Sequence, residues 1–207
     1  MFPLLETSIA MRYNQAMDKI ERVTVYFFLS LLMLIPMVLG GDTSRPLVPE
    51  SNRMKTDHAP TPFSAEEIRK GCPDGRLTSY LIEIPGKPNS YSMTRFVEPN
   101  REQTGFENWT TNLQGKIIGK PKRIDAKWRD LQAHASYPEK FTSIALDKIT
   151  IPAGSFECLR YSVQMEGDLK KLWFARALPG PPVKFEHYKN GSRVFSMILV
   201  KNEVLKK

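Results

Sequence analysis

The chain has 207 residues, of which 41% are apolar and 25% charged. This composition can bury a core, but the length is short for two full domains, so we expect one domain and a leader. The 30 basic and 22 acidic residues give a net charge of +8. Residues 1–41 carry three of each sign, so the folded part is basic. A basic surface attracts anionic membranes, nucleic acids and anionic ligands alike.

The first 41 residues have the pattern of an export leader. Three basic residues precede a stretch without charge, Val23–Gly41, whose most apolar part, Val23–Ile35, has the length of a signal-peptide core. Small residues follow at Gly40 and Gly41, where we expect cleavage. An uncleaved anchor is the alternative, because the whole uncharged stretch approaches the roughly 20 residues of a spanning helix. The protein is therefore expected to be periplasmic or secreted, or held by one N-terminal transmembrane helix.

Residues 42–62 are rich in Pro, Ser, Thr and charge and show no apolar periodicity, which predicts a flexible tether. A single β-rich domain is expected at 63–203. It opens with Ser64 and Glu67, whose spacing is that of a capping box, so a short helix is predicted at 64–70.

The first half of the domain has four stretches that favour strands. Leu77–Ile84 and Tyr91–Val97 read as a hairpin, and Phe106–Thr111 and Lys116–Ile118 are weaker candidates. A helix is expected at Ala126–Ala135, where apolar residues recur at spacings of three and four.

The second half contains the clearest hairpin, in which Thr142–Ile151 and Ser155–Met165 flank a Pro-Ala-Gly turn. Three more strands follow, at Leu169–Ala175, Val183–Tyr188 and Val194–Val200. Roughly eight strands and one or two short helices predict a mainly β (α+β) fold, a curved antiparallel meander or half-barrel.

The last third of the chain resembles a known group of proteins. Ile151–Tyr161 reads IPAGSFECLRY, and it is followed by LWFA at Leu172–Ala175 and PGPPV at Pro179–Val183. This pattern resembles bacterial envelope proteins of unknown function that share the β half-barrel of periplasmic lipoprotein carriers. The resemblance implies a concave sheet that cradles acyl chains or a hydrophobic partner segment, and it implies no catalytic residue.

Cys72 and Cys158 are the two cysteines of the chain. In an oxidising compartment a disulfide between them is the simplest expectation, and two buried thiols are the alternative. Cys158 as a nucleophile would need His134 or His187 close in space, and no cysteine-enzyme signature surrounds it.

Four aromatic residues are candidates to line a ligand cavity, with plain core as the alternative: Trp109, Trp173, Phe174 and Phe185. The three histidines lack metal-ligand spacing, and no nucleophile elbow, phosphate loop or dinucleotide fingerprint occurs. We therefore expect no metal, no cofactor and no catalytic residue. The densest positive stretch is a candidate contact with lipid headgroups, or simply a solvated surface: Lys116, Lys120, Lys122, Arg123, Lys127 and Arg129.

The leader, the tether and the resemblance together predict an exported, non-enzymatic envelope protein that binds a lipid-like ligand or an envelope protein. It would contact the membrane through the leader if that is uncleaved. Nucleic acid is not an expected partner of an exported chain. An exported hydrolase whose site is invisible in sequence, and a membrane-anchored structural domain, are the alternatives.

Overall fold

The computed structural model describes residues 46–205. The predicted leader, with Gly40 and Gly41, lies outside this part of the chain. The helices are η1 (Glu50–Asn52), α2 (Ala65–Gly71), α3 (Trp128–Ala133) and η2 (Glu139–Phe141). The strands are β1 (Arg76–Glu83), β2 (Ser90–Val97), β3 (Gln103–Thr111), β4 (Ile117–Lys127), β5 (Thr142–Ile151), β6 (Gly154–Met165), β7 (Asp168–Ala175), β8 (Lys184–Lys189) and β9 (Ser192–Val204). No helix within 46–205 is long and apolar enough to span a membrane.

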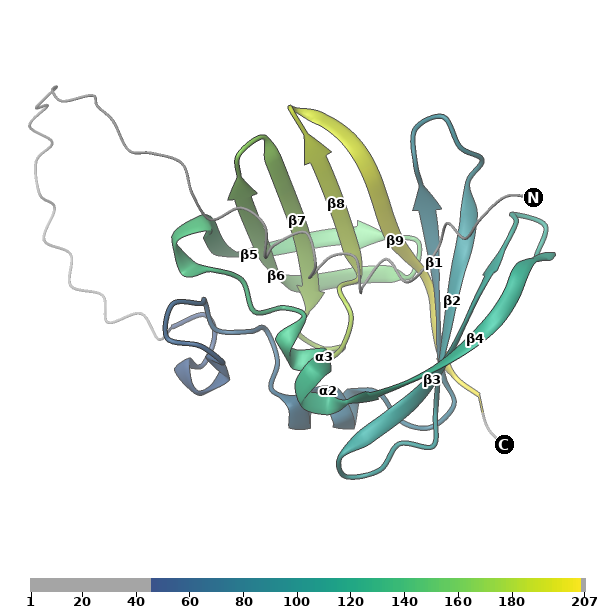
Figure 1. Cartoon of the computed structure of the whole chain (residues 1–207), viewed down its shortest axis with the longest axis horizontal. Coiled ribbons are helices and arrows are strands. Elements are labelled where there is room, and N and C mark those ends of the chain that lie inside the picture. The colour runs from purple at the N-terminus through teal and green to yellow at the C-terminus, as the bar shows by residue number, and fades with distance from the viewer. Residues whose placement is uncertain (1–45, 206–207) are drawn as a thin grey trace, which may run out of the picture. The chain divides into compact units, whose positions relative to one another are not determined.

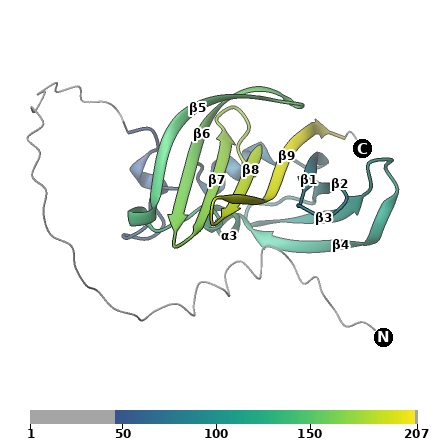
Figure 2. The same ribbon diagram turned by 90° about the horizontal axis from the view of Figure 1, so that it is seen from above.

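All nine strands of the described part form one antiparallel sheet in the order β4-β3-β2-β1-β9-β8-β7-β6-β5. Figure 1 shows the sheet curving from one half to the other, with β9 passing between them. Seen from above, β4 and β5 are its two edges (Figure 2). β5 also approaches β9, which is not its neighbour in the sheet, as expected of a strongly curved sheet. The predicted antiparallel half-barrel is confirmed, with nine strands where the sequence suggested about eight.

The two α-helices pack against each other at one end of the sheet (Figure 1). α2 begins where the sequence predicts, because Ser64 and Glu67 form the capping box: each side chain accepts a hydrogen bond from the backbone N–H of the other residue. Ile68 of α2 and Trp128 of α3 are buried against the sheet. The helices thereby cover part of one face of the sheet.

Alternation along each strand divides the sheet into two faces. On β6, Leu159, Tyr161 and Val163 pack in the core cluster under the helices, and we call this side the helix face. Residues of even number on β6, such as Cys158 and Arg160, lie on the opposite face. The cluster of the helix face consists of Val48, Phe63, Ile68, Cys72, Phe96, Trp128, Ala135, Leu159, Tyr161, Val163, Leu172 and Phe174. A second cluster consists of Tyr80, Cys158, Trp173, Ala175, Val183 and Leu199.

The segment expected as a tether, 42–62, is described from residue 46 onward. Val48 and Thr61 in it are buried, and the carbonyl of Pro60 accepts a hydrogen bond of 2.7 Å from the hydroxyl of Tyr161. Residues 46–62 therefore pack on the domain.

β4 differs most from the sequence prediction. The chain shows one strand at Ile117–Lys127 and a short helix at Trp128–Ala133, where a three-residue strand and a ten-residue helix were predicted. Gly119, which has a φ of +79°, and Pro121 disfavour a strand, so the sequence of this segment predicts a loop. Pairing with β3, across a register shift, nevertheless holds it in the sheet. A tertiary contact thus overrides the local preference.

Candidate functional site

The two edges of the sheet differ in how well they resist further pairing. β4 is interrupted by its register shift, carries Pro121, and is exposed along almost its whole length with several lysines. Such features discourage the addition of another strand. β5 pairs with β6 in unbroken register from Thr142 to Ile151, and its sequence contains neither Gly nor Pro. β5 is therefore the regular, unprotected edge.

The N–H of Thr142, the first residue of β5, donates to the carbonyl of Glu139. From Ser143 to Ile151 the outer side of β5 has no backbone partner within residues 46–205, because β6 is the strand hydrogen-bonded to it and no other backbone bond of the described chain reaches these residues. Half of the polar groups of an edge strand point away from its neighbour. Leu146, in the middle of β5, is 56% exposed. The β5 edge therefore offers both unpaired peptide groups and an uncovered apolar side chain.

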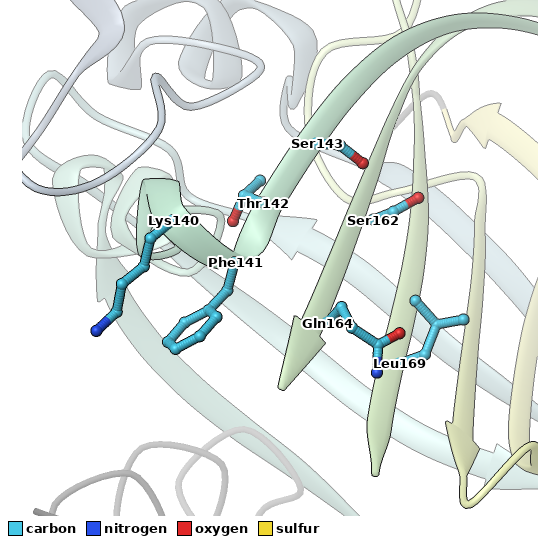
Figure 3. A pocket seen from close by; sticks show the side chains of 7 residues that line it. All are labelled: Lys140, Phe141, Thr142, Ser143, Ser162, Gln164 and Leu169. Carbon is cyan, nitrogen blue, oxygen red and sulfur yellow. The ribbon is translucent and has the colours of Figure 1, made fainter. Parts of the chain in front are cut away.

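An open pocket of about 490 Å³ lies beside the start of β5. Figure 3 shows Lys140 and Phe141 on one side of it and Gln164 and Leu169 on the strands across from them. The ammonium group of Lys140 lies 4.7 Å from the ring centre of Phe141, a cation–π contact. The complete lining is Lys140, Phe141, Thr142, Ser143, Ser162, Gln164 and Leu169. Lys140 is the charged residue of this lining, so the pocket favours an anionic group.

The opposite face carries a buried ionic cluster centred on Glu186, which is 7% exposed. Its carboxylate accepts a hydrogen bond of 2.9 Å from the Tyr188 hydroxyl and lies 3.0 Å from the ammonium of Lys184. Arg193 lies 3.7 Å from Glu186 and 3.3 Å from Glu83, which extends the cluster to β1. Burial alone would raise the pKa of Glu186, but the bonds from Lys184 and Tyr188 outweigh it and lower the pKa.

Trp173 connects this ionic cluster to β5, because it contacts both Lys184 of the cluster and Asp147 of β5. Its indole N–H donates to Asp147 over 2.9 Å, and the ammonium of Lys184 lies 4.6 Å from the ring centre. Arg160 lies 3.4 Å from the same oxygen of Asp147. These charges are matched to one another, which indicates a structural cluster rather than a site for a free ion.

The structure does not bring the four predicted cavity aromatics together. Trp173 and Phe174 are consecutive residues of β7, so they lie on opposite faces. Phe174 packs edge-on against Phe63 and Tyr161 in the helix-face cluster. Phe185 packs partly buried on the same cluster, at 5.5 Å from the ring of Phe195. Trp109 is half-buried on β3, in the other half of the sheet.

Cys72 and Cys158 are free, buried thiols in different clusters. Burial raises the pKa of Cys72, although nearby Arg76 opposes the shift, and burial with the charge of Asp147 raises the pKa of Cys158 to about 11. Neutral thiols are poor nucleophiles. The disulfide stays a prediction, which a mass measurement without reductant tests.

The described residues contain no group of side chains suited to hold a metal ion. His187 contacts Asp168 over 2.9 Å. Burial lowers the pKa of His134. His58 contacts the Ser136 hydroxyl through Nδ1 over 2.9 Å, and its Nε2 lies 3.9 Å from Asp57. This serine–histidine–aspartate proximity lies where the segment before α2 bridges to Pro138.

Sequence reasoning missed Leu146 and Lys140 as site residues. The strand that contains Leu146 was predicted with its correct bounds, but an edge position depends on the order of all nine strands. Lys140 lies two residues after Pro138. The proline predicts that a helix ends there, but it gives no sign that the following residues line a pocket. The basic stretch is confirmed only as surface: Lys116, Lys120, Lys122, Arg123, Lys127 and Arg129 are all exposed.

The curved, open antiparallel sheet defines a half-barrel fold. The chain matches no protein-family model, and no curated protein is significantly similar to it. Among solved structures, MucB is 9% identical with a TM-score of 0.46, over 68% of this chain and 57% of MucB. A putative outer membrane lipoprotein-sorting protein domain from Vibrio parahaemolyticus is 8% identical with a TM-score of 0.27, over 69% and 93% of the two chains. A LolA superfamily protein from Nitrosomonas europaea is 7% identical with a TM-score of 0.21, over 70% and 95%.

The lipoprotein-sorting domain and the LolA superfamily protein agree with the resemblance of the sequence to the half-barrel of lipoprotein carriers. The chain spans little more than half the length of MucB.

Proposed function

We propose that the protein is an exported binding protein without catalysis of its own, which holds a protein segment or a lipid-like ligand. One observation carries the proposal: β5, an edge strand of the sheet, combines peptide groups that have no backbone partner in the described chain with a large apolar side chain, Leu146, that is 56% exposed. An open strand edge with an uncovered apolar side chain can pair with another chain. The charge-free stretch in residues 23–41 supports export.

Native mass spectrometry of the protein produced in its own compartment tests this function. We expect a ligand-sized adduct that leaves on denaturation, or a co-purifying envelope protein that chemical crosslinking joins to an edge strand. The denatured spectrum also reports whether the mature chain starts near Gly41 and whether Cys72 and Cys158 are bonded. Protein that carries no adduct, takes up no lipid-like probe and captures no partner would contradict the proposal.

A hydrolase is a second candidate, supported by the contact between Ser136 and His58 described above. A base within hydrogen-bond reach of a hydroxyl is the starting point of nucleophilic catalysis. Asp57 lies beyond hydrogen-bond distance of that histidine, so the arrangement is weaker than an assembled triad. A fluorophosphonate probe tests it: labelling that disappears in Ser136→Ala would favour the hydrolase, and the absence of labelling would remove it.

A further inference from the structure

We infer that the β5 edge binds an extended segment of a partner protein as an additional antiparallel strand, with a carboxylate at the C-terminal end of that segment paired to Lys140. The inference rests on the proposed binding function and names its site and its partner chemistry. Addition of a strand to a free sheet edge is a common mode of peptide recognition, in which backbone hydrogen bonds supply affinity and side-chain pockets supply specificity.

The choice of edge follows from the contrast between the two edge strands. β4 combines a register shift, Pro121 and a row of exposed lysines, all of which oppose pairing. β5 is straight in register over ten residues and is rich in β-branched residues, which suit a paired strand. A strand that docks on β5 satisfies peptide groups for which the described chain provides no backbone partner.

Leu146 sets the apolar requirement of the partner. It is exposed on the helix face, in one row with Leu159 and Phe174. An added strand places every second side chain on that face. An apolar residue opposite Leu146 would therefore bury a side chain that is now 56% exposed.

The charges beside β5 set the electrostatic requirement. Lys140 and Lys148 are exposed and have no ion pair within residues 46–205. Glu157 lies opposite Lys148 on β6 and offsets its charge. Of the carboxylates near Lys140, Glu139 is paired with Arg53 at 2.8 Å, and Asp57 lines a second pocket together with Lys140 without an ion pair between the two. Lys140 is therefore the excess charge at this end of the edge.

The direction of pairing determines where the carboxylate sits. Every strand pair of this sheet is antiparallel, so the added strand would run opposite to β5 and end beside Thr142, next to Lys140 and the pocket. The carboxylate is either an acidic side chain or the end of the partner chain. A second copy of this protein fits less well, because both copies carry a net charge of +8.

The test uses the full-length protein and a synthetic peptide in which Thr and Val alternate around a central Leu and which ends in Asp. Fluorescence anisotropy measures its affinity for the wild type, Leu146→Lys, Lys140→Glu and the matched control Ile118→Lys. Ile118 is 54% exposed on β4, so it tests an equally exposed apolar residue on the other edge. Circular dichroism melting shows that each variant is folded.

We expect Leu146→Lys and Lys140→Glu each to weaken binding about tenfold or more, as for residues central to an interface, and Ile118→Lys to leave it unchanged. A peptide ending in Lys should restore affinity to Lys140→Glu. Comparison of the peptide with an amidated and with a free C-terminus shows whether Lys140 pairs with the Asp side chain or with the terminal carboxylate. Binding that Ile118→Lys weakens equally, or a Lys-ended peptide bound as well by the wild type, would overturn the edge site.

The outcomes also separate this inference from the proposed function. A lipid adduct that persists in Leu146→Lys, without peptide binding, would support a binding function and overturn the β5 edge as its site. Self-association that Leu146→Lys abolishes would identify a second copy as the occupant and overturn the partner segment. Absence of adduct, partner and peptide binding would overturn both.

Discussion

Arg76 is a buried cation that holds three parts of the fold together. It is 2% exposed and has no carboxylate partner in the described chain. Its guanidinium donates to the carbonyls of Gly71 and Pro179, over 2.6 and 2.8 Å, and to the side chain of Asn202 over 2.9 Å. The end of α2, the β7–β8 connection and β9 therefore meet at one side chain.

Replacement of Arg76 by Met should lower the free energy of unfolding by at least about 2 kcal/mol, because three buried acceptors lose their donor. Arg76→Lys keeps the charge but not the several N–H donors of the guanidinium, so it should lower the free energy of unfolding by less than Arg76→Met does. Urea unfolding followed by tryptophan fluorescence measures both. Equal stability of Arg76→Met and the wild type would contradict this role.

Glu186 should make the fold sensitive to acid. Its pKa is below the usual range in the folded state, so its stabilising contribution is complete above the unfolded pKa of about 4.3 and is lost as the pH falls through the folded pKa. Glu186→Gln should cost about 1–3 kcal/mol at neutral pH and flatten the acid limb of stability against pH. Melting curves between neutral and acidic pH check this, and an unchanged acid limb would be the contrary result.

At the scale of the elements, the capping box is the feature of α2 that sequence and structure share. Ser64 accepts from the N–H of Glu67 over 3.2 Å, and the Glu67 carboxylate accepts from the N–H of Ser64 over 2.7 Å. Ser64→Ala should therefore lower the free energy of unfolding by about 1 kcal/mol, whereas Ser64→Asp should keep the cap. Urea midpoints compare the two variants, and equal midpoints would argue against the cap.

Elements defined by local chemistry were predictable, and elements defined by distant pairing were not. The hairpin of β5 and β6 follows from a turn at Pro152-Ala153-Gly154, and its predicted bounds agree with the structure to within one residue. β4 escaped prediction because Gly119 and Pro121 disfavour a strand until β3 lies beside it. Opposite faces for Trp173 and Phe174 were already implied by the alternation of a strand.

The candidate site, like β4, depends on the pairing of distant parts of the chain. That Leu146 is exposed on a free edge depends on β5 being the last strand of the sheet, and no local pattern reports the order of strands. The pocket beside Lys140 depends on β6 and β7 reaching past the start of β5. Sequence therefore predicted the strand that carries the site without predicting the site.

At the scale of the whole molecule, β9 connects the sheet. It pairs with β1 on one side and β8 on the other, and no other strand pair joins β1–β4 to β5–β8. A chain that ends at Gly191 should lose the cooperative thermal transition of the full-length protein, because each half keeps unpaired strands. Calorimetry compares the two chains, and a single transition at the original temperature would contradict it.

The central position of β9 also determines the order in which the sheet can assemble. A chain that emerges N-terminus first, from a ribosome or a translocation channel, can form its hairpins as they appear, but the strand that unites them arrives last. Until then β1 and β8 each present an open side, and the contacts between the halves span most of the sequence. We therefore expect the chain to stay loosely folded, and exposed to proteases and chaperones, until β9 has emerged.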